Sequence, residues 1–93
     1  MEIKIKGYTG TFAENKDTAK DLRENILKPM IEIGEPIILN FSSIDSTTQS
    51  FVHALISDIF QTNGEAALEF IEFKSCNTAV KSLIRTVINY SLD

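Results

Sequence analysis

The stretch that decides the fold is residues 36–60, which consist of PIILNF, SSIDSTTQ and SFVHALISDIF in succession. Residues 36–41 form a short apolar run rich in β-branched side chains, which predicts a strand buried on both faces. Farther on, apolar residues stand at positions 51, 52, 55, 56, 59 and 60, the spacing of one face of an amphipathic helix. The sequence thus predicts a central strand that a hydroxyl-rich loop joins to a helix.

This loop ends in a helix start. Ser46 and Gln49, three residues apart, have the form of a capping box, so we expect the helix to begin at Ser46. The unpaired N–H groups in the first turn of a helix favour negative charge. We therefore expect residues 45–50 to lie exposed at the rim of the sheet, where another protein can contact them.

Two extended pieces are predicted before the first helix. Residues 2–6 alternate between polar and apolar side chains, as in a strand with one covered and one solvent-exposed face. No crossover precedes this strand, so it is free to lie antiparallel at or near an edge of the sheet. Gly7 can supply a turn, and residues 8–12 are expected to form a second short extended piece beside it.

The first helix is predicted over residues 18–33, where apolar side chains recur at steps of three and four. Asp17 or Thr18 is the expected N-cap, and Gly34 is the expected end. Pro29 lacks a backbone donor and crowds the preceding turn. It therefore predicts a kink or an early end of the helix.

The second helix is expected to end near residues 63–64, and residues 68–73 are predicted to form the last strand. Asn77 or Thr78 can cap a third helix. Helices between strands imply parallel pairing with right-handed crossovers. The predicted fold class is α/β: a single small domain with a mixed, mostly parallel sheet of about four strands and three helices, which crowd one face of the sheet.

Length and composition limit the number of domains and the kinds of site that the chain can form. A chain of 93 residues supports one core, so residues 1–93 are expected to be a single domain. Hydrophobic residues make up 43% and charged residues 24%, which argues against disorder. The single cysteine, Cys76, excludes an internal disulfide and a four-cysteine metal site. Neither a signal peptide nor a membrane span is evident, so a cytoplasmic location is expected.

The charge balance bears on the kind of partner. The net charge is −4, from 13 acidic and 9 basic residues. Nucleic-acid binding rests mainly on Lys and Arg that neutralise phosphates, so no nucleic-acid partner is expected. Lys81 and Arg85 could form a small basic patch on the last helix, but a solvated helix face is the simpler interpretation.

Four segments suggest a family: LNFSSI at 39–44, TQSFVHALIS at 48–57, FIEFKSCN at 70–77 and VKSLI at 80–84. Together with the predicted order of elements, they make the chain resemble the STAS-like domains of bacteria, small relatives of anti-sigma-factor antagonists. The resemblance covers roughly residues 10–93. It implies a STAS-like fold and a non-catalytic regulatory role in binding another protein.

In STAS antagonists the corresponding loop carries Asp-Ser-(Ser/Thr)-Gly-Leu, and an ATP-binding anti-sigma kinase phosphorylates its serine. Residues 45–47 match the opening of that motif, while Thr48 and Gln49 stand in place of Gly-Leu. One alignment of the motif implies Ser46 as the phosphoacceptor, and the other implies Thr48. The resemblance also implies a protein partner of the ATP-binding, kinase-like kind.

The loop and the helix after it supply the other candidate contacts. The predicted partner-binding residues are Asp45, Thr47, Gln49, Ser50 and His53. An alternative function is a small-molecule or nucleotide-binding sensor domain at the same loop, because STAS domains attached to transporters and sensors can bind ligands there. Helix capping alone is the simpler explanation of the hydroxyls, and a homodimer through an edge strand remains open.

No catalytic, cofactor or metal site is predicted. His53 is the only histidine, and a general base needs a nucleophile within hydrogen-bonding reach. Ser46 or Ser50 with His53, as a hydrolase or transferase, is therefore the weakest of the three interpretations. One histidine with scattered carboxylates is too little for a zinc site, and no phosphate-binding glycine motif is present.

Overall fold

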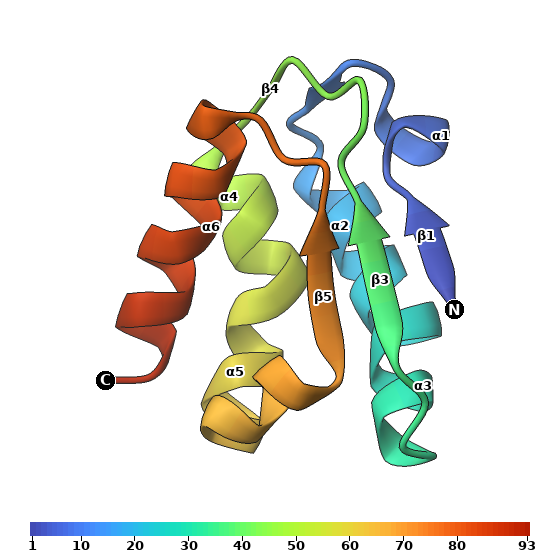
Figure 1. Cartoon of the computed structure of the whole chain (residues 1–93), viewed down its shortest axis with the longest axis vertical. Helices are drawn as coiled ribbons and strands as arrows, with labels where there is room; N and C mark the ends of the chain where they lie inside the picture. The colour runs from blue at the N-terminus through green and yellow to red at the C-terminus, as the bar shows by residue number, and fades with distance from the viewer.

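Three parallel strands form the main sheet (Figure 1). The computed structural model describes residues 1–93, and the sheet order is β1 (Glu2–Lys4), β3 (Ile37–Asn40), β5 (Ile71–Lys74). Two shorter strands, β2 (Phe12–Ala13) and β4 (Ser46–Thr47), form a separate parallel pair. The predicted α/β class is confirmed.

The first strand lies at an edge of the sheet, as expected, but its direction differs from the antiparallel option. β1 runs parallel to β3, with Glu2 opposite Ile38 and Lys4 opposite Asn40. The long helix between the two strands carries the chain back to the starting end of the sheet, and a strand that begins there must run parallel. The main sheet is therefore parallel throughout.

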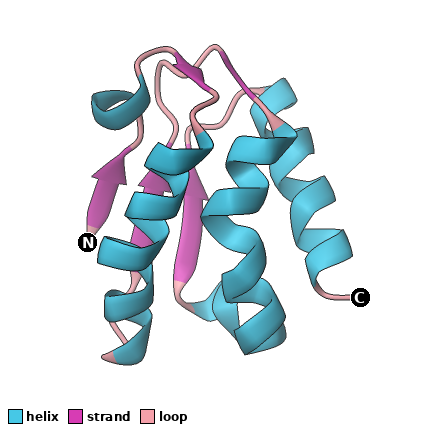
Figure 2. Cartoon of the chain, turned by 180° about the vertical axis from the view of Figure 1, so that it is seen from behind, coloured by secondary structure: helices cyan, strands magenta, loops and turns pink.

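All long helices cover one face of this sheet (Figure 2). Along β3, Ile37 and Leu39 are buried beneath the helices, whereas Ile38 and Asn40 are half-buried. The prediction that this strand is buried on both faces is therefore wrong, and the prediction that the helices crowd one face is confirmed. The result is a two-layer domain with one open sheet face.

The helical segments lie between and after the strands, and three of them are long. A short α1 (Lys6–Thr9) occupies part of the expected extended piece at residues 8–12, of which only β2 is a strand. The first long helix consists of α2 (Lys16–Leu22), a π-helical turn (Arg23–Leu27) and α3 (Lys28–Glu32). The second consists of α4 (Gln49–Val52), a π-helical turn (His53–Ser57) and α5 (Asp58–Asn63), and α6 (Thr78–Ser91) is the third.

The first long helix begins earlier than predicted and continues through Pro29. Its N-cap is Asn15, whose side chain accepts hydrogen bonds from the N–H groups of Asp17 and Thr18, so neither predicted cap is correct. The π-helical turn directly precedes Pro29, and in it the Lys28 N–H bonds to the Arg23 carbonyl. This wider turn accommodates the missing donor and the bulk of the proline ring without ending the helix.

The first and the second long helix each end at a glycine in the left-handed region, as predicted. Gly34 has φ +74° and Gly64 has φ +63°, a conformation in which a side chain would be strained. A 3-10 helix (Gly64–Glu69) then follows the second long helix. Because it takes up the start of the strand predicted at residues 68–73, β5 begins only at Ile71.

Polar contacts hold the first and second long helices side by side. In one, the Arg23 guanidinium donates a hydrogen bond of 2.7 Å to the Ala54 carbonyl, which lies in the other π-helical turn. In another, the Lys28 ammonium lies 2.7 Å from Asp58 and 2.9 Å from Glu24. The second helix is thus fixed against the first, and its N-terminal turn is fixed with it.

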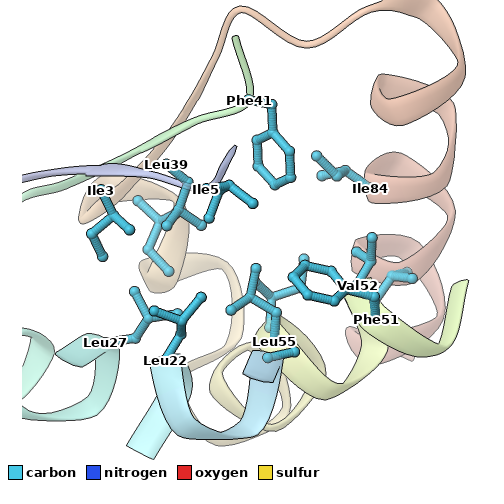
Figure 3. Close-up of a cluster of buried hydrophobic side chains, with 14 of the residues drawn as sticks. Ile3, Ile5, Leu22, Leu27, Leu39, Phe41, Phe51, Val52, Leu55 and Ile84 are labelled. Carbon is cyan, nitrogen blue, oxygen red and sulfur yellow. The ribbon is translucent and has the colours of Figure 1, made fainter. Parts of the chain in front are cut away.

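The core lies between the sheet and the helices (Figure 3). Figure 3 shows Ile3, Leu39 and Phe41 from the sheet side opposite Leu22, Leu27 and Leu55 from the helices. The predicted apolar stripe of the second helix is buried at all six positions: Phe51, Val52, Leu55, Ile56, Ile59 and Phe60. The same burial anchors the start of that helix in the core.

The last helix begins where predicted. Asn77 is its N-cap, and its side-chain oxygen accepts a hydrogen bond from the Val80 N–H. Val80, Ile84 and Val87 are buried, and α6 packs mainly on α4, the π-helical turn after it and α5. No helix in the protein is long and apolar enough to span a membrane.

Candidate functional site

The candidate site is the loop between β3 and α4, together with the first turns of α4. It lies at the carboxyl ends of the parallel strands, where the arrowheads point in Figure 1. In α/β sheets, ligands bind in the region beyond these ends. We call residues 45–50 the tip.

Hydrogen bonds hold the tip on two sides. The Asp45 N–H donates to the Thr11 carbonyl over 2.8 Å. The Asn77 side-chain amide donates to the carbonyls of Ile44 and Asp45, at 3.1 and 2.9 Å. The loop is therefore joined both to the chain before β2 and to the start of α6, and its path is fixed.

The helix start differs from the predicted capping box. The N-cap is Thr48, whose hydroxyl oxygen accepts a hydrogen bond of 3.0 Å from the Phe51 N–H. Ser46 lies two residues too early because it belongs to β4, where it pairs with Phe12. Strand pairing over long sequence separation keeps it extended, which the local motif could not indicate.

The three consecutive hydroxyls have different roles. The Thr47 side chain is buried, and its hydroxyl donates to the Ala13 carbonyl over 2.7 Å. Thr48 is half-buried and caps the helix. Ser46 is exposed, and its side chain makes no hydrogen bond. Of the two predicted phosphoacceptors, only Ser46 carries a hydroxyl that the fold does not use.

Three of the predicted partner-binding residues line one hollow. Gln49, Ser50 and His53 surround it together with Lys16, Ala54 and Tyr90, and its volume is about 470 Å³. The His53 Nδ1 atom lies 2.9 Å from the Tyr90 hydroxyl, and the centroids of the two rings are 5.7 Å apart. Asp45 is exposed on the loop outside this hollow, and Thr47 is buried away from it.

Sequence reasoning missed Lys16 and Tyr90. They come from the start of α2 and the end of α6, and only the packing of three helices brings them beside His53. The only sign of either residue in the sequence was the helix start predicted at residues 17–18, next to Lys16. The side-chain hydrogen bond of His53 goes to Tyr90 and not to Ser46 or Ser50, so neither serine is paired with this base.

A second polar hollow lies beside the loop, at the ends of β1 and β3. Lys4, Lys6 and Asn40 line it with Gly7, Ser42 and Ser43, and its volume is about 490 Å³. The Asn40 amide donates to the Glu2 carboxylate over 2.7 Å, and its oxygen accepts from the Ser42 N–H. The hydrogen bond from Asn40, with a smaller contribution from Lys74, lowers the pKa of Glu2. No three His, Cys, Asp or Glu side chains are grouped as metal ligands.

These features define a small two-layer α/β domain with a hydroxyl-bearing loop at the carboxyl end of its sheet. A model of the family described as "STAS-like domain of unknown function (DUF4325)" matches residues 18–81. The chain therefore belongs to this family of STAS-like domains. No curated protein and no solved structure matches the chain significantly.

Proposed function

We propose that the protein is a non-catalytic, cytoplasmic regulatory module that binds a protein partner through its tip, as anti-sigma-factor antagonists do. An ATP-binding, kinase-like protein is the proposed partner, and Ser46 is the proposed phosphoacceptor. Membership of the STAS-like family supports the general role. The choice of residue rests on the separate roles of the three neighbouring hydroxyls.

The observation that carries the proposal is the free Ser46 side chain. A phosphate on Thr47 would have to enter the buried layer, and one on Thr48 would add bulk to the half-buried oxygen that caps α4. A phosphate on Ser46 would meet neither obstacle, because that side chain is exposed and makes no hydrogen bond. It would add a charge of about −1.5 to −2 to the tip while leaving the fold intact.

The proposed partner surface consists of Asp45, Gln49, Ser50 and His53 around Ser46, all of which are exposed. Thr47 is left out because its side chain is buried. A partner in contact with this surface would meet a new negative charge beside Asp45 after phosphorylation. Like charges at an interface weaken binding, so the modified protein should release an acidic partner surface.

The test is phosphorylation by an ATP-binding, kinase-like protein, which would be sought first among the products of the adjacent genes. Purified protein is incubated with that protein and ATP, and phosphosites are mapped by mass spectrometry. We expect label at Ser46 in the wild type and in Thr48→Ala, and none in Ser46→Ala. Ser46→Asp should bind the partner at least about tenfold more weakly than the wild type.

Matched controls make this test decisive. Ser50→Ala removes another exposed hydroxyl of the tip and should leave Ser46 as the labelled residue, whatever its effect on the rate. Label on Thr48 alone would contradict the choice of Ser46, and absence of label between residues 46 and 50 would contradict the regulatory proposal. The His53→Ala variant should still be labelled at Ser46, and a slower rate of labelling would measure the contact that His53 makes with the partner.

The hollow beside the tip supports a second candidate, a small-molecule or nucleotide sensor. Lys16, Ser50 and His53 offer a cation and hydrogen-bonding groups around a space of about 470 Å³. A ligand that binds only the folded state raises the melting temperature by mass action. Thermal-shift measurements with a nucleotide and metabolite panel separate the candidates: a shift that Lys16→Ala and His53→Ala abolish would favour the sensor.

A further inference from the structure

The helix layer is wider than the sheet that it covers. Packed helices lie about 8–10 Å apart, whereas paired strands lie about 4.8 Å apart. Three strands therefore cannot cover three long helices. The part of the helix layer that the sheet leaves uncovered lies on the β5 side. There α6 packs on the neighbouring helices and extends past the last strand (Figure 1).

A groove of about 370 Å³ occupies this overhang, between β5 and α6. Phe73 lines it from the strand, and Ile84 and Ile88 line it from the helix. Phe73 is aligned with Leu39, a fully buried residue of β3, yet it is only half-buried itself. The sheet thus lacks about one strand on this side, which would cover the apolar side chains of the groove.

The outer edge of β5 has no strand partner, since β3 is its only neighbour. The carbonyls of Phe70 and Lys74 point toward β3, where they accept hydrogen bonds from Ile37 and Phe41. Backbone groups alternate in direction along a strand, so those of residues 71 and 73 point away from the sheet. An extended segment beside β5 would find these N–H and C=O groups free.

The charge along the groove is positive. Lys81 and Arg85 stand one turn apart on α6, both line the groove and both are exposed. Neither forms an ion pair, and no acidic side chain lines the groove. In a protein with a net charge of −4, this is a site where acidic side chains of a partner would be attracted.

A second copy of the chain fits this edge poorly. If two β5 edges paired, each copy would bring its own overhanging α6 beneath the joint. Because each α6 already extends past its own β5, the two helices would occupy the same space. A single extended segment without a helix beneath it avoids this collision.

We propose that the groove between β5 and α6 binds an extended acidic segment of a partner protein, which adds a fourth strand to the main sheet. Its alternate apolar side chains cover Phe73 and Ile88, and its acidic side chains lie near Lys81 and Arg85. Main-chain hydrogen bonds to residues 71 and 73 supply affinity, as in other cases of strand addition to a sheet edge. This surface is separate from the tip and does not depend on phosphorylation of Ser46.

The test uses the full chain and a synthetic nine-residue peptide in which valine and glutamate alternate. In NMR titrations we expect shifts confined to residues 71–76 and 81–89. The peptide should also slow hydrogen exchange at the amides of residues 71 and 73, and slow the reaction of half-buried Cys76 with a thiol reagent. A peptide of the same composition with its valines grouped together, and one that alternates valine with lysine, should each bind at least about tenfold more weakly.

Charge reversal at the groove supplies the matched variants. Lys81→Glu with Arg85→Glu should weaken the acidic peptide at least about tenfold, whereas Lys6→Glu with Lys20→Glu, the same charge change elsewhere on the surface, should not. If the groove variant fails to fold, the wild type still provides the test. Slower reaction of its Cys76 with the thiol reagent in the presence of the peptide would show that the peptide occupies the groove. Labelling of Ser46 by the kinase-like partner should be equal in both variants.

Three results would overturn the proposal. The first is the absence of any perturbation of residues 71–89 up to the solubility limit of the acidic peptide. The second is equal binding of the grouped peptide, because an edge strand requires the alternating pattern. The third is occupation of the same groove by something else: a single-stranded oligonucleotide that shifts these resonances more strongly, or a dimer whose formation protects the amides of residues 71 and 73.

Discussion

The tip lies beyond the carboxyl ends of the main sheet and the groove between β5 and α6 lies along one edge of it, and the fold engages more of the backbone at the tip. At the tip, the backbone is already engaged: Asn77 holds the Ile44 and Asp45 carbonyls, and Thr11 accepts from Asp45. At the groove, the outer backbone groups of β5 have no strand partner. A partner can therefore contact the tip mainly through side chains, whereas at the groove it can also pair with main chain.

The tip and the groove also differ in how they are packed. Beneath the tip, Phe51 of α4 is fully buried in the core. At the groove, Phe73 is half-buried because nothing covers its outer side. The difference indicates that the tip depends on the core for its shape, while the groove tolerates change at modest cost.

The largest expected effect tests this contrast in packing. Phe51→Ala should lower the free energy of unfolding by about 3–5 kcal/mol, because it leaves a cavity in a closed core. Phe73→Ala should lower it by only about 1–2 kcal/mol, since that side chain is already partly exposed to solvent. Urea unfolding curves provide both values, and equal losses would contradict the description of the groove as incompletely covered.

The next effect concerns Asn77, which connects the tip to α6. Asn77→Ala should cost about 1–2 kcal/mol, because the helix loses its N-cap. Asn77→Asp keeps a capping oxygen but loses the amide that donates to the Ile44 and Asp45 carbonyls. We expect the second variant to retain most of the stability and to show faster hydrogen exchange at the Asp45 amide. Unchanged exchange there would mean that the loop does not need this contact.

A smaller effect separates the hydroxyls within the tip. Thr48→Ala should lower the free energy of unfolding by about 1 kcal/mol, because the Phe51 N–H loses its acceptor. Ser46→Ala should change it by less than about 0.5 kcal/mol, as for other exposed positions. Thermal unfolding of the two variants beside the wild type measures the difference. A larger loss for Ser46→Ala would restore the capping role that the sequence predicted.

The smallest effect is expected from Glu2, which supports the loop through Asn40. The pKa of Glu2 is lowered below its ordinary value of 4.5, so its contribution to stability is present above that value. It is lost as the pH falls through the lowered pKa. Glu2→Gln should therefore lose less stability than the wild type between neutral pH and about pH 3 in urea unfolding. Glu72→Gln, which removes a carboxylate from the same open face, is the matched control.

Much of the fold was predictable because it follows from local patterns. The stripe of six apolar residues from Phe51 to Phe60 fixed the buried face of the second helix, and Gly34, Gly64 and Asn77 marked helix ends correctly. These features depend on residues within a few positions of one another. Resemblance and pattern together identified the STAS-like class, which the family match confirms.

The predictions that failed depend on contacts between residues far apart in the sequence or, at Pro29, on an irregular helical turn. Ser46 has the local form of a cap, but Phe12, far away in the sequence, draws it into a strand and leaves the cap to Thr48. Pro29 has the form of a helix end, but a π-helical turn before it accommodates the ring. Only part of the hollow at the tip was predicted. Gln49, Ser50 and His53 were named from the sequence, whereas Lys16 and Tyr90 come from other helices and reach the hollow only through packing.

The absence of any hairpin has a consequence for how the chain acquires its structure. Every pair of strands joins residues more than thirty positions apart, so no part of either sheet can form before a long segment has closed. Local order must start in the helices, and strands can align only once these have collapsed onto each other. Such a topology folds more slowly than a helical bundle of this length, and while it does so its uncovered strands are open to association with other chains.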